Sequence, residues 1–245
     1  MEKLVEELIE ELKGGYAIVH ADGTDDEIIN FYETLNSHIG VVQKADDLKY
    51  TNIINDVWVN IKYDSESEKP WETDDILKLH TDNSRNYANL TQLVCLEAAP
   101  FSGHTTLIKN ERVVELIKFW DSYKKTNLFD KILNLEVTFP EFIGPILRIE
   151  NGKYIFCFNH AKLMKTELDE EKRKIICELD DFLHNKIFLS NLMTEIKLDR
   201  GDALIFNDED MIHGRRSILG DRHYIKCSIL MSPNEKFTKK LNTAS

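Results

Sequence analysis

The tripeptide His80-Thr81-Asp82 is the first part of the sequence that could do metal chemistry. It lies in a short run of strand-forming residues, 78–83. Side chains alternate along a strand, so His80 and Asp82 are expected on the same face. An imidazole beside a carboxylate could supply two ligands to a metal ion. This spacing also arises often by chance, so the pair alone is weak evidence.

A third ligand could come from His213, which is followed by Gly214 and comes just beyond the predicted buried strand 203–206. Two histidines and one carboxylate leave three positions of an octahedral ion open, the pattern of non-haem Fe(II) oxygenases. A closed tetrahedral zinc site is less compatible with the sequence, because the cysteines are not spaced to form one.

The run from Arg222 to Met231 reads as a strand that carries two cations on one face, with Arg222, Tyr224, Lys226 and Ser228 alternating. If that face lines the interior, the cations need an anionic partner or water. A dicarboxylate would be suitable, since arginine binds carboxylates through two parallel hydrogen bonds. The alternative is that this is the exposed polar face of an edge strand.

Many short strands must position these residues. We expect strands at 16–20, 57–63, 78–83, 90–98, 104–109, 135–139, 154–159, 194–198, 203–206 and 223–231. Helices are expected at 1–12, from Thr24 through the capping box with Glu27, at 110–124 and at 166–184. This order favours one β-barrel or sandwich domain over residues 1–245, with helical insertions around 110–125 and 166–186.

Composition excludes several classes of protein. The 245 residues are 42% hydrophobic and carry a net charge of −12, which disfavours nucleic acid and anionic membranes as partners. The four cysteines, at positions 95, 157, 177 and 227, have mostly apolar neighbours and are expected to be free, buried thiols. With neither a signal peptide nor a long apolar run expected, we predict a cytoplasmic protein.

Three segments together resemble the taurine dioxygenase/clavaminate synthase-like branch of the Fe(II)/2-oxoglutarate oxygenases. They are His80-Thr81-Asp82, the turn 100–106, and Gly201-Asp202 through His213-Gly214-Arg215 to Arg222. The resemblance extends over roughly residues 16–231. It implies a mainly β fold with flanking helices and a double-stranded β-helix (jelly-roll) core.

The same resemblance implies a ligand set and a co-substrate. His80, Asp82 and His213 would bind Fe(II), and O2 and 2-oxoglutarate would be consumed. Thr105 and Arg222 match the positions that hold the distal carboxylate of 2-oxoglutarate, and Lys226 matches a further basic residue that contacts the co-substrate or an anionic group of the substrate. Arg222 follows His213 by only nine residues, a tighter spacing than usual in the family. Whether Arg222 or Lys226 holds the co-substrate is therefore open.

The resemblance also sets the expected reaction and its alternatives. It implies hydroxylation or desaturation of a small polar molecule, such as a free or carrier-bound amino acid. Asp82 argues against halogenation, because related halogenases have a small residue at that position. Asn83, Ser84, Asn159 and Arg215 are the candidate substrate contacts. A ligand-sensing jelly roll without turnover and a cupin-like metal-dependent isomerase or hydrolase are the competing hypotheses.

Overall fold

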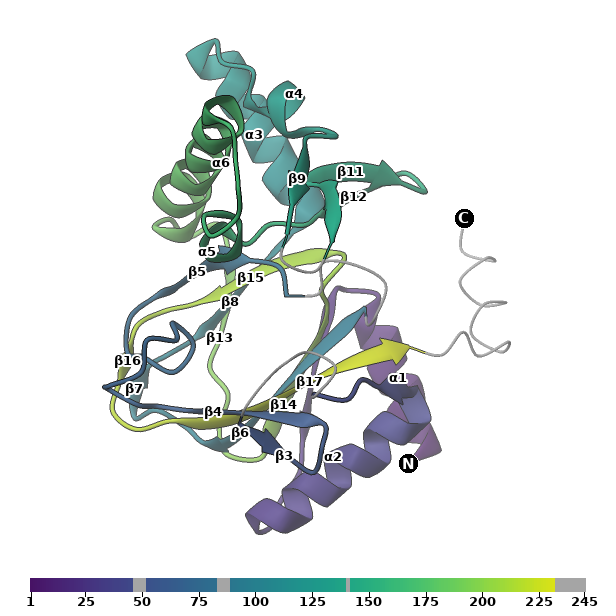
Figure 1. Ribbon diagram of the computed structural model, residues 1–245. Helices are drawn as coiled ribbons and strands as arrows, with labels where there is room; N and C mark the ends of the chain where they lie inside the picture. Colours follow the sequence, from purple (N-terminus) through teal and green to yellow (C-terminus); the bar gives the residue numbers. More distant parts are fainter. Residues whose placement is uncertain (46–51, 83–88, 140–141, 232–245) are drawn as a thin grey trace.

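Two antiparallel sheets form the core of the protein (Figure 1). The computed structural model describes residues 1–45, 52–82, 89–139 and 142–231. The larger sheet has the order β1-β14-β6-β17-β4-β3, and β2 also pairs with β17; the smaller sheet has the order β13-β8-β15-β5. All strand pairs in both sheets are antiparallel, which is the arrangement of a jelly roll.

The strands of the larger sheet are β1 (Tyr16–His20), β2 (Gly40–Val42), β3 (Ile53–Ile54), β4 (Trp58–Lys62), β6 (Leu90–Glu97), β14 (Asp202–Asn207) and β17 (His223–Met231). Those of the smaller sheet are β5 (Leu77–His80), β8 (Thr105–Lys109), β13 (Thr194–Ile196) and β15 (Met211–Arg215). Three two-stranded pairs complete the set: β7 (Phe101–Ser102) with β16 (Ile218–Leu219), β9 (Glu136–Thr138) with β10 (Ile143–Pro145), and β11 (Leu147–Glu150) with β12 (Lys153–Phe156).

The larger sheet is buried on both faces. Leu204 and Phe206 of β14 point into the space between the sheets, where they pack with residues such as Leu107 of β8. Ala203 and Ile205 alternate to the opposite face, which is covered by α1 (Glu2–Leu12) and α2 (Asp25–Ile39). Burial on both sides explains why β14 reads as a continuous apolar run in the sequence.

Helix α2 begins where the sequence predicts. The Thr24 hydroxyl accepts a hydrogen bond from the Glu27 backbone N–H at 3.4 Å, and the Glu27 carboxylate accepts one from the Thr24 backbone N–H at 2.8 Å. Both halves of the capping box are therefore present.

A long insertion between β8 and β13 covers the outer face of the smaller sheet. It contains α3 (Asn110–Lys124), α4 (Leu128–Ile132), the strands β9 to β12, α5 (His160–Leu163), α6 (Glu170–Phe182) and a π-helical segment η2 (Leu183–Phe188). Its own apolar core is continuous with Leu79, Ile108 and Ile212, which point outward from β5, β8 and β15. In Figure 1 this insertion forms the upper part of the molecule.

Several sequence-based boundaries need correction. The strand expected at 78–83 ends at His80, and the strand expected at 154–159 ends at Phe156. The helix expected from 166 begins at Glu170, because Asp169 caps it by accepting a hydrogen bond from the Lys172 N–H, and it continues as η2. His213 lies inside a separate strand, β15, and not in a turn beyond β14.

Two further expectations concern the state of the cysteines and the presence of a membrane-spanning helix. All four cysteines are free, but Cys177 is exposed, against the expectation that all are buried. None of the helices in the described part of the chain is both long and apolar enough to cross a bilayer.

Candidate metal centre

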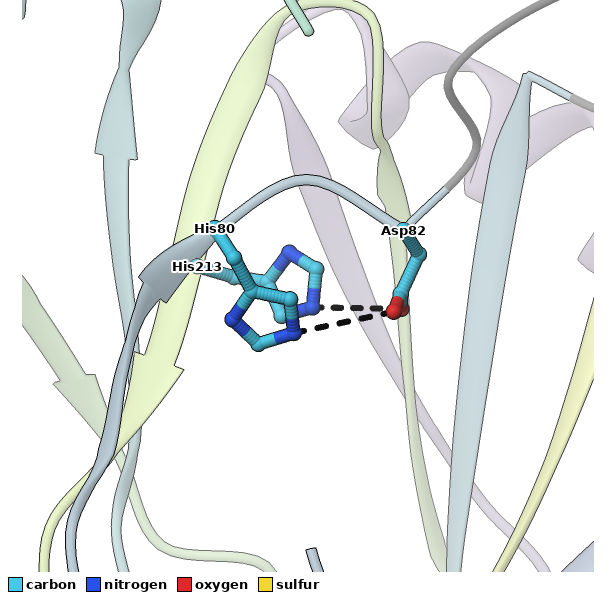
Figure 2. Close-up of side chains that lie close together, drawn as sticks. All are labelled: His80, Asp82 and His213. Atoms are coloured by element: carbon cyan, nitrogen blue, oxygen red, sulfur yellow. Dashed lines mark ion pairs between the residues drawn. The ribbon is translucent and has the colours of Figure 1, made fainter. Parts of the chain in front are cut away.

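His80, Asp82 and His213 converge between the two sheets (Figure 2). His80 and His213 are paired residues of neighbouring strands β5 and β15, and their ring centroids are 4.3 Å apart. The Asp82 carboxylate faces both rings, with its Oδ1 3.6 Å from His80 Nε2 and its Oδ2 3.2 Å from His213 Nε2. One potential ligand atom from each residue lies within 4.8 Å of the other two.

His80 and Asp82 are positioned by different contacts. His80 Nδ1 is 2.7 Å from the backbone carbonyl of Lys78, which favours the tautomer with its proton on Nδ1 and leaves Nε2 for a metal. Asp82 lies beyond the end of β5, so strand alternation does not place it. Instead Thr81 pairs with Phe158 of the insertion: the Thr81 N–H donates to the Phe158 carbonyl at 2.8 Å, and the Thr81 hydroxyl accepts from the Phe158 N–H at 3.0 Å.

The protonation states of Asp82 and His213 suit metal ligands. Although burial opposes it, the Lys226 ammonium and His213 hold the pKa of Asp82 well below its usual range. Burial lowers the pKa of His213, and the neighbouring His80 lowers it further. The His213 imidazole is thus neutral at neutral pH, as a metal ligand must be. Two histidines and a carboxylate on one side fit a divalent ion with three open positions.

A buried arginine lies at the start of β17. Arg222 is 4% exposed, donates a hydrogen bond to the Trp71 carbonyl at 3.0 Å and stacks over the Tyr224 ring. Its Nε–H is buried and has no hydrogen-bond partner among the residues that the structure describes. A buried guanidinium with an unused N–H fits a carboxylate ligand such as that of a dicarboxylic acid.

The other predicted co-substrate residues lie on the inner faces of the sheets. Thr105 is buried, pairs in register with Arg215, and alternates onto the same face of β8 as Leu107, which packs between the sheets. Lys226 of β17 reaches the metal centre, where its ammonium forms an ion pair with Asp82 Oδ2. The face shared by Arg222 and Lys226 is therefore the inner face, and not the exposed face of an edge strand.

The candidate substrate contacts have structural partners or lie outside the description. Asn83 and Ser84 fall outside the described residues. Asn159 Oδ1 accepts a hydrogen bond from the Lys162 N–H at 3.1 Å and so caps α5. Arg215 is 3% exposed and donates hydrogen bonds to backbone carbonyls of the segment 70–75, namely those of Pro70, Trp71, Thr73 and Asp75. Burial lowers the pKa of Arg215 to about 9, with the nearby Arg222 contributing.

Two residues that contact the centre were not predicted from the sequence. Thr81 lies between two candidate ligands, and its hydroxyl looks unremarkable in a strand-like run. Asp208 lies in an acidic stretch, 208–210, that resembles an exposed turn, yet its carboxylate is buried against Asp82 and His213. The position of Asp208 soon after a buried strand is the signal in the sequence that could have indicated its role, and it is a weak one.

Comparisons with known proteins agree with this geometry. A family model described as taurine catabolism dioxygenase TauD, TfdA family, matches residues 2–228. Among curated proteins, none is significantly similar in sequence. A crystal structure of asparagine oxygenase (AsnO) superposes with a TM-score of 0.71 at 13% identity, covering 94% of this chain and 79% of that one.

Two further solved structures have the same fold. A mutant of the non-heme iron oxygenase OrfP in complex with (3S)-hydroxy-L-Arg gives a TM-score of 0.64 at 14% identity, covering 95% of this chain and 81% of that one. A taurine dioxygenase from Burkholderia xenovorans gives a TM-score of 0.61 at 12% identity, covering 94% and 82% of the two chains. At these identities the likeness establishes a shared fold.

Proposed function

This chain belongs to the taurine catabolism dioxygenase TauD, TfdA family, and we propose that it is an Fe(II)- and 2-oxoglutarate-dependent oxygenase that hydroxylates a small polar molecule, an amino acid or a derivative of one. One observation carries the proposal. His80, Asp82 and His213 converge in the space between the two sheets, and the inner face of the larger sheet also carries Arg222, a buried arginine whose Nε–H has no partner among the described residues.

The substrate class is supported by two structural neighbours. One is titled an asparagine oxygenase, and the other was crystallised with (3S)-hydroxy-L-Arg. A hydroxylated amino acid is therefore the expected product. Desaturation is the second oxidative outcome compatible with an Asp at position 82.

Each part of the site has a role in this proposal. His80, Asp82 and His213 would hold Fe(II) through one face and leave the other for the co-substrate and O2. Bound Fe(II) would supply the activation of O2, which is the oxidant, and 2-oxoglutarate would supply two of the four electrons that O2 accepts as it is converted to succinate and CO2. Arg222 and Thr105 would bind the distal carboxylate, and Lys226 would bind an anionic group of the co-substrate or substrate.

The reaction can be tested directly. Under anaerobic conditions, Fe(II) and 2-oxoglutarate added together are expected to give a visible charge-transfer band. In air, a panel of free amino acids is then screened for succinate release and, by mass spectrometry, for a product that has gained one oxygen. A product that has lost two hydrogens indicates desaturation.

The competing functions give different results in the same assay. A ligand-sensing jelly roll binds both Fe(II) and 2-oxoglutarate without releasing succinate. A metal-dependent isomerase or hydrolase binds metal, and its affinity for 2-oxoglutarate does not depend on Arg222. Absence of succinate with every substrate in iron-replete protein counts against the proposed oxygenase.

A further inference from the structure

Asp208 is a buried carboxylate beside the candidate metal centre. It is 1% exposed and lies in the turn between β14 and β15. That turn is fixed by its own hydrogen bonds: Asn207 Oδ1 accepts from the Glu209 N–H at 3.0 Å, and the Asp210 N–H donates to the Asn207 carbonyl at 3.1 Å. Burying a carboxylate is costly unless hydrogen bonds or charges compensate. Two of the compensating contacts of Asp208 reach the metal centre.

The first contact is to the backbone of Asp82. Both carboxylate oxygens of Asp208 lie 3.1 Å from the Asp82 N–H, which donates to them. Since Asp82 follows the last residue of β5, no ladder hydrogen bond of that strand fixes its backbone. The hydrogen bond to Asp208 therefore fixes the point from which the Asp82 side chain projects toward the histidines.

The second contact is to the ring of His213. Asp208 Oδ1 is 3.4 Å from His213 Nδ1, while Nε2 of the same ring faces Asp82 at 3.2 Å. His213 Nδ1 is buried and has no hydrogen bond to any described residue. At 3.4 Å, Asp208 Oδ1 is close enough to become its acceptor after a small shift. In metal sites the ring nitrogen opposite the metal usually donates to a carboxylate or carbonyl, which orients the ring. For His80, the corresponding acceptor is the Lys78 carbonyl, which lies 2.7 Å from Nδ1.

We propose that Asp208 is a positioning residue of the metal centre: one carboxylate fixes the Asp82 backbone and orients the His213 ring, and so sets the relative placement of two ligands that are distant in sequence. The inference rests on the proposed function, since it concerns the same metal site. Asp208 also adds a negative charge close to a bound dication, which strengthens metal binding.

The test is to measure metal affinity in Asp208→Asn. Asparagine has nearly the same shape, but it loses the charge and one of the two acceptor oxygens. Loss of such an outer contact typically weakens metal binding by about 10–100-fold. Titration of metal-free protein with Mn(II) or Co(II) under argon gives the dissociation constant without any turnover, and the visible Co(II) spectrum reports the ligand geometry.

Asp210→Asn is the matched control. Asp210 belongs to the same turn and contacts Asn207 and Lys153, and none of its hydrogen bonds or ion pairs within the described part of the chain reaches a candidate ligand. Urea unfolding of both metal-free variants compares their stabilities. The inference is supported if Asp208→Asn, and not Asp210→Asn, has a metal dissociation constant at least about 10-fold higher than that of wild type and a changed Co(II) spectrum. Equal affinities and spectra in wild type and Asp208→Asn, or an equal loss in Asp210→Asn, overturn the inference.

A second measurement covers the case in which Asp208→Asn does not fold. In zinc-loaded wild-type protein, the His213 Nδ1 proton should be exchange-protected and shifted downfield by its hydrogen bond to Asp208. A rapidly exchanging proton overturns the inference. Wild-type protein that binds no divalent metal overturns both this inference and the proposed function, whereas wild-type binding that Asp208→Asn leaves unchanged overturns this inference alone.

Discussion

Arg222 and Lys226 have different surroundings, and the difference indicates which of the two binds the carboxylate of 2-oxoglutarate. The Lys226 ammonium forms an ion pair with Asp82. Arg222 has no ion pair with any residue that the structure describes, and its Nε–H has no partner. A buried cation that lacks an anion is the better site for a carboxylate. We therefore predict that Arg222 holds 2-oxoglutarate.

Arg222→Gln is expected to weaken 2-oxoglutarate binding by about 10–100-fold, the equivalent of losing about 1.5–3 kcal/mol from a charged hydrogen bond. Anaerobic titration of the charge-transfer band measures the dissociation constant. Arg216→Gln is the control: Arg216 is partly buried, and its guanidinium pairs with Glu195 and donates to the Phe188 carbonyl. The affinity of this variant for 2-oxoglutarate should stay within about twofold of wild type. A loss in Lys226→Gln but not in Arg222→Gln would assign the co-substrate to Lys226 instead.

At the scale of elements, the end of β5 depends on the insertion. Thr81 pairs with Phe158 through both its N–H and its hydroxyl, and this pairing holds the chain between His80 and Asp82. Thr81→Val keeps the shape but leaves the buried Phe158 N–H without its acceptor, which costs about 1–3 kcal/mol. Urea unfolding should show this loss, accompanied by weaker metal binding.

Thr81→Ser is the matched variant for this prediction. Serine retains the hydroxyl that accepts from the Phe158 N–H, so stability and metal affinity should lie closer to wild type than in Thr81→Val. If serine and valine are equally destabilising, packing of the methyl group and not the hydrogen bond determines the effect.

The pairing of β1 with β14 carries a pH-dependent contact. His20 lies between Asp202, at 2.8 Å, and Asp22, at 3.1 Å, and hydrogen bonds to these carboxylates raise its pKa above 6.5. A raised pKa in the folded state means that charged His20 stabilises the fold. This stabilisation is complete below the unfolded pKa and is lost as the pH rises through the folded pKa.

We therefore expect His20→Gln to lower the melting temperature relative to wild type more at about pH 5.5 than at about pH 8.5. The effect should be small, because the ring is exposed to solvent. His38→Gln, at an exposed position of α2, serves as the comparison variant. An identical pH dependence in His20→Gln and wild type would contradict the assignment.

The elements differ in how well the sequence predicts them. The helix at 110–124 and the capping box at Thr24 follow from local periodicity and local hydrogen bonds, and both are present. β15 escaped prediction because its five residues include Gly214 and follow an acidic turn, so they show no clear alternation. Asp82 lies outside its predicted strand because Phe158 holds the backbone of Thr81 and Asp208 holds that of Asp82, and both partners are far away in sequence.

The recognition of the family and of the jelly-roll fold is confirmed by the family match and the structural neighbours. The structure brings His80, Asp82 and His213 together as the motif predicts, while their binding of iron stays a prediction. The substrate contacts could not be derived from the sequence. They depend on which segments border the site in the fold, and a local sequence pattern does not reveal this. Asn159 and Arg215 show this, since both have structural partners.

In the described part of the chain, a β core lies between a pair of helices and the insertion of helices and short strands. α1 and α2 cover the larger sheet, and the insertion covers the smaller one (Figure 1). The candidate ligands come from β5, the segment after it, and β15, so a bound metal links parts of the fold that are distant in sequence. Binding to the folded state alone must raise the stability of the entire domain.

Metal and 2-oxoglutarate together should therefore raise the melting temperature. At about 100 times the dissociation constant the gain is about 2.7 kcal/mol, which corresponds to roughly 5–10 °C for a chain of this size. Scanning calorimetry with Mn(II) and 2-oxoglutarate under argon measures the shift, and a chelator should reverse it. 2-Oxobutyrate, which lacks the distal carboxylate, should give a smaller shift. Equal shifts with the two acids would contradict a role for Arg222.

The path of the chain through the smaller sheet makes the insertion an interchangeable module. β8 ends at Lys109 and β13 begins at Thr194, and these two strands are neighbours, with Leu107 opposite Thr194. A graft from a relative could thus replace the whole segment between them without breaking a ladder of the core. Any such chimera must keep two features: apolar side chains that cover Leu79, Ile108 and Ile212, and a backbone position that pairs with Thr81. Without the second, the metal centre loses its support.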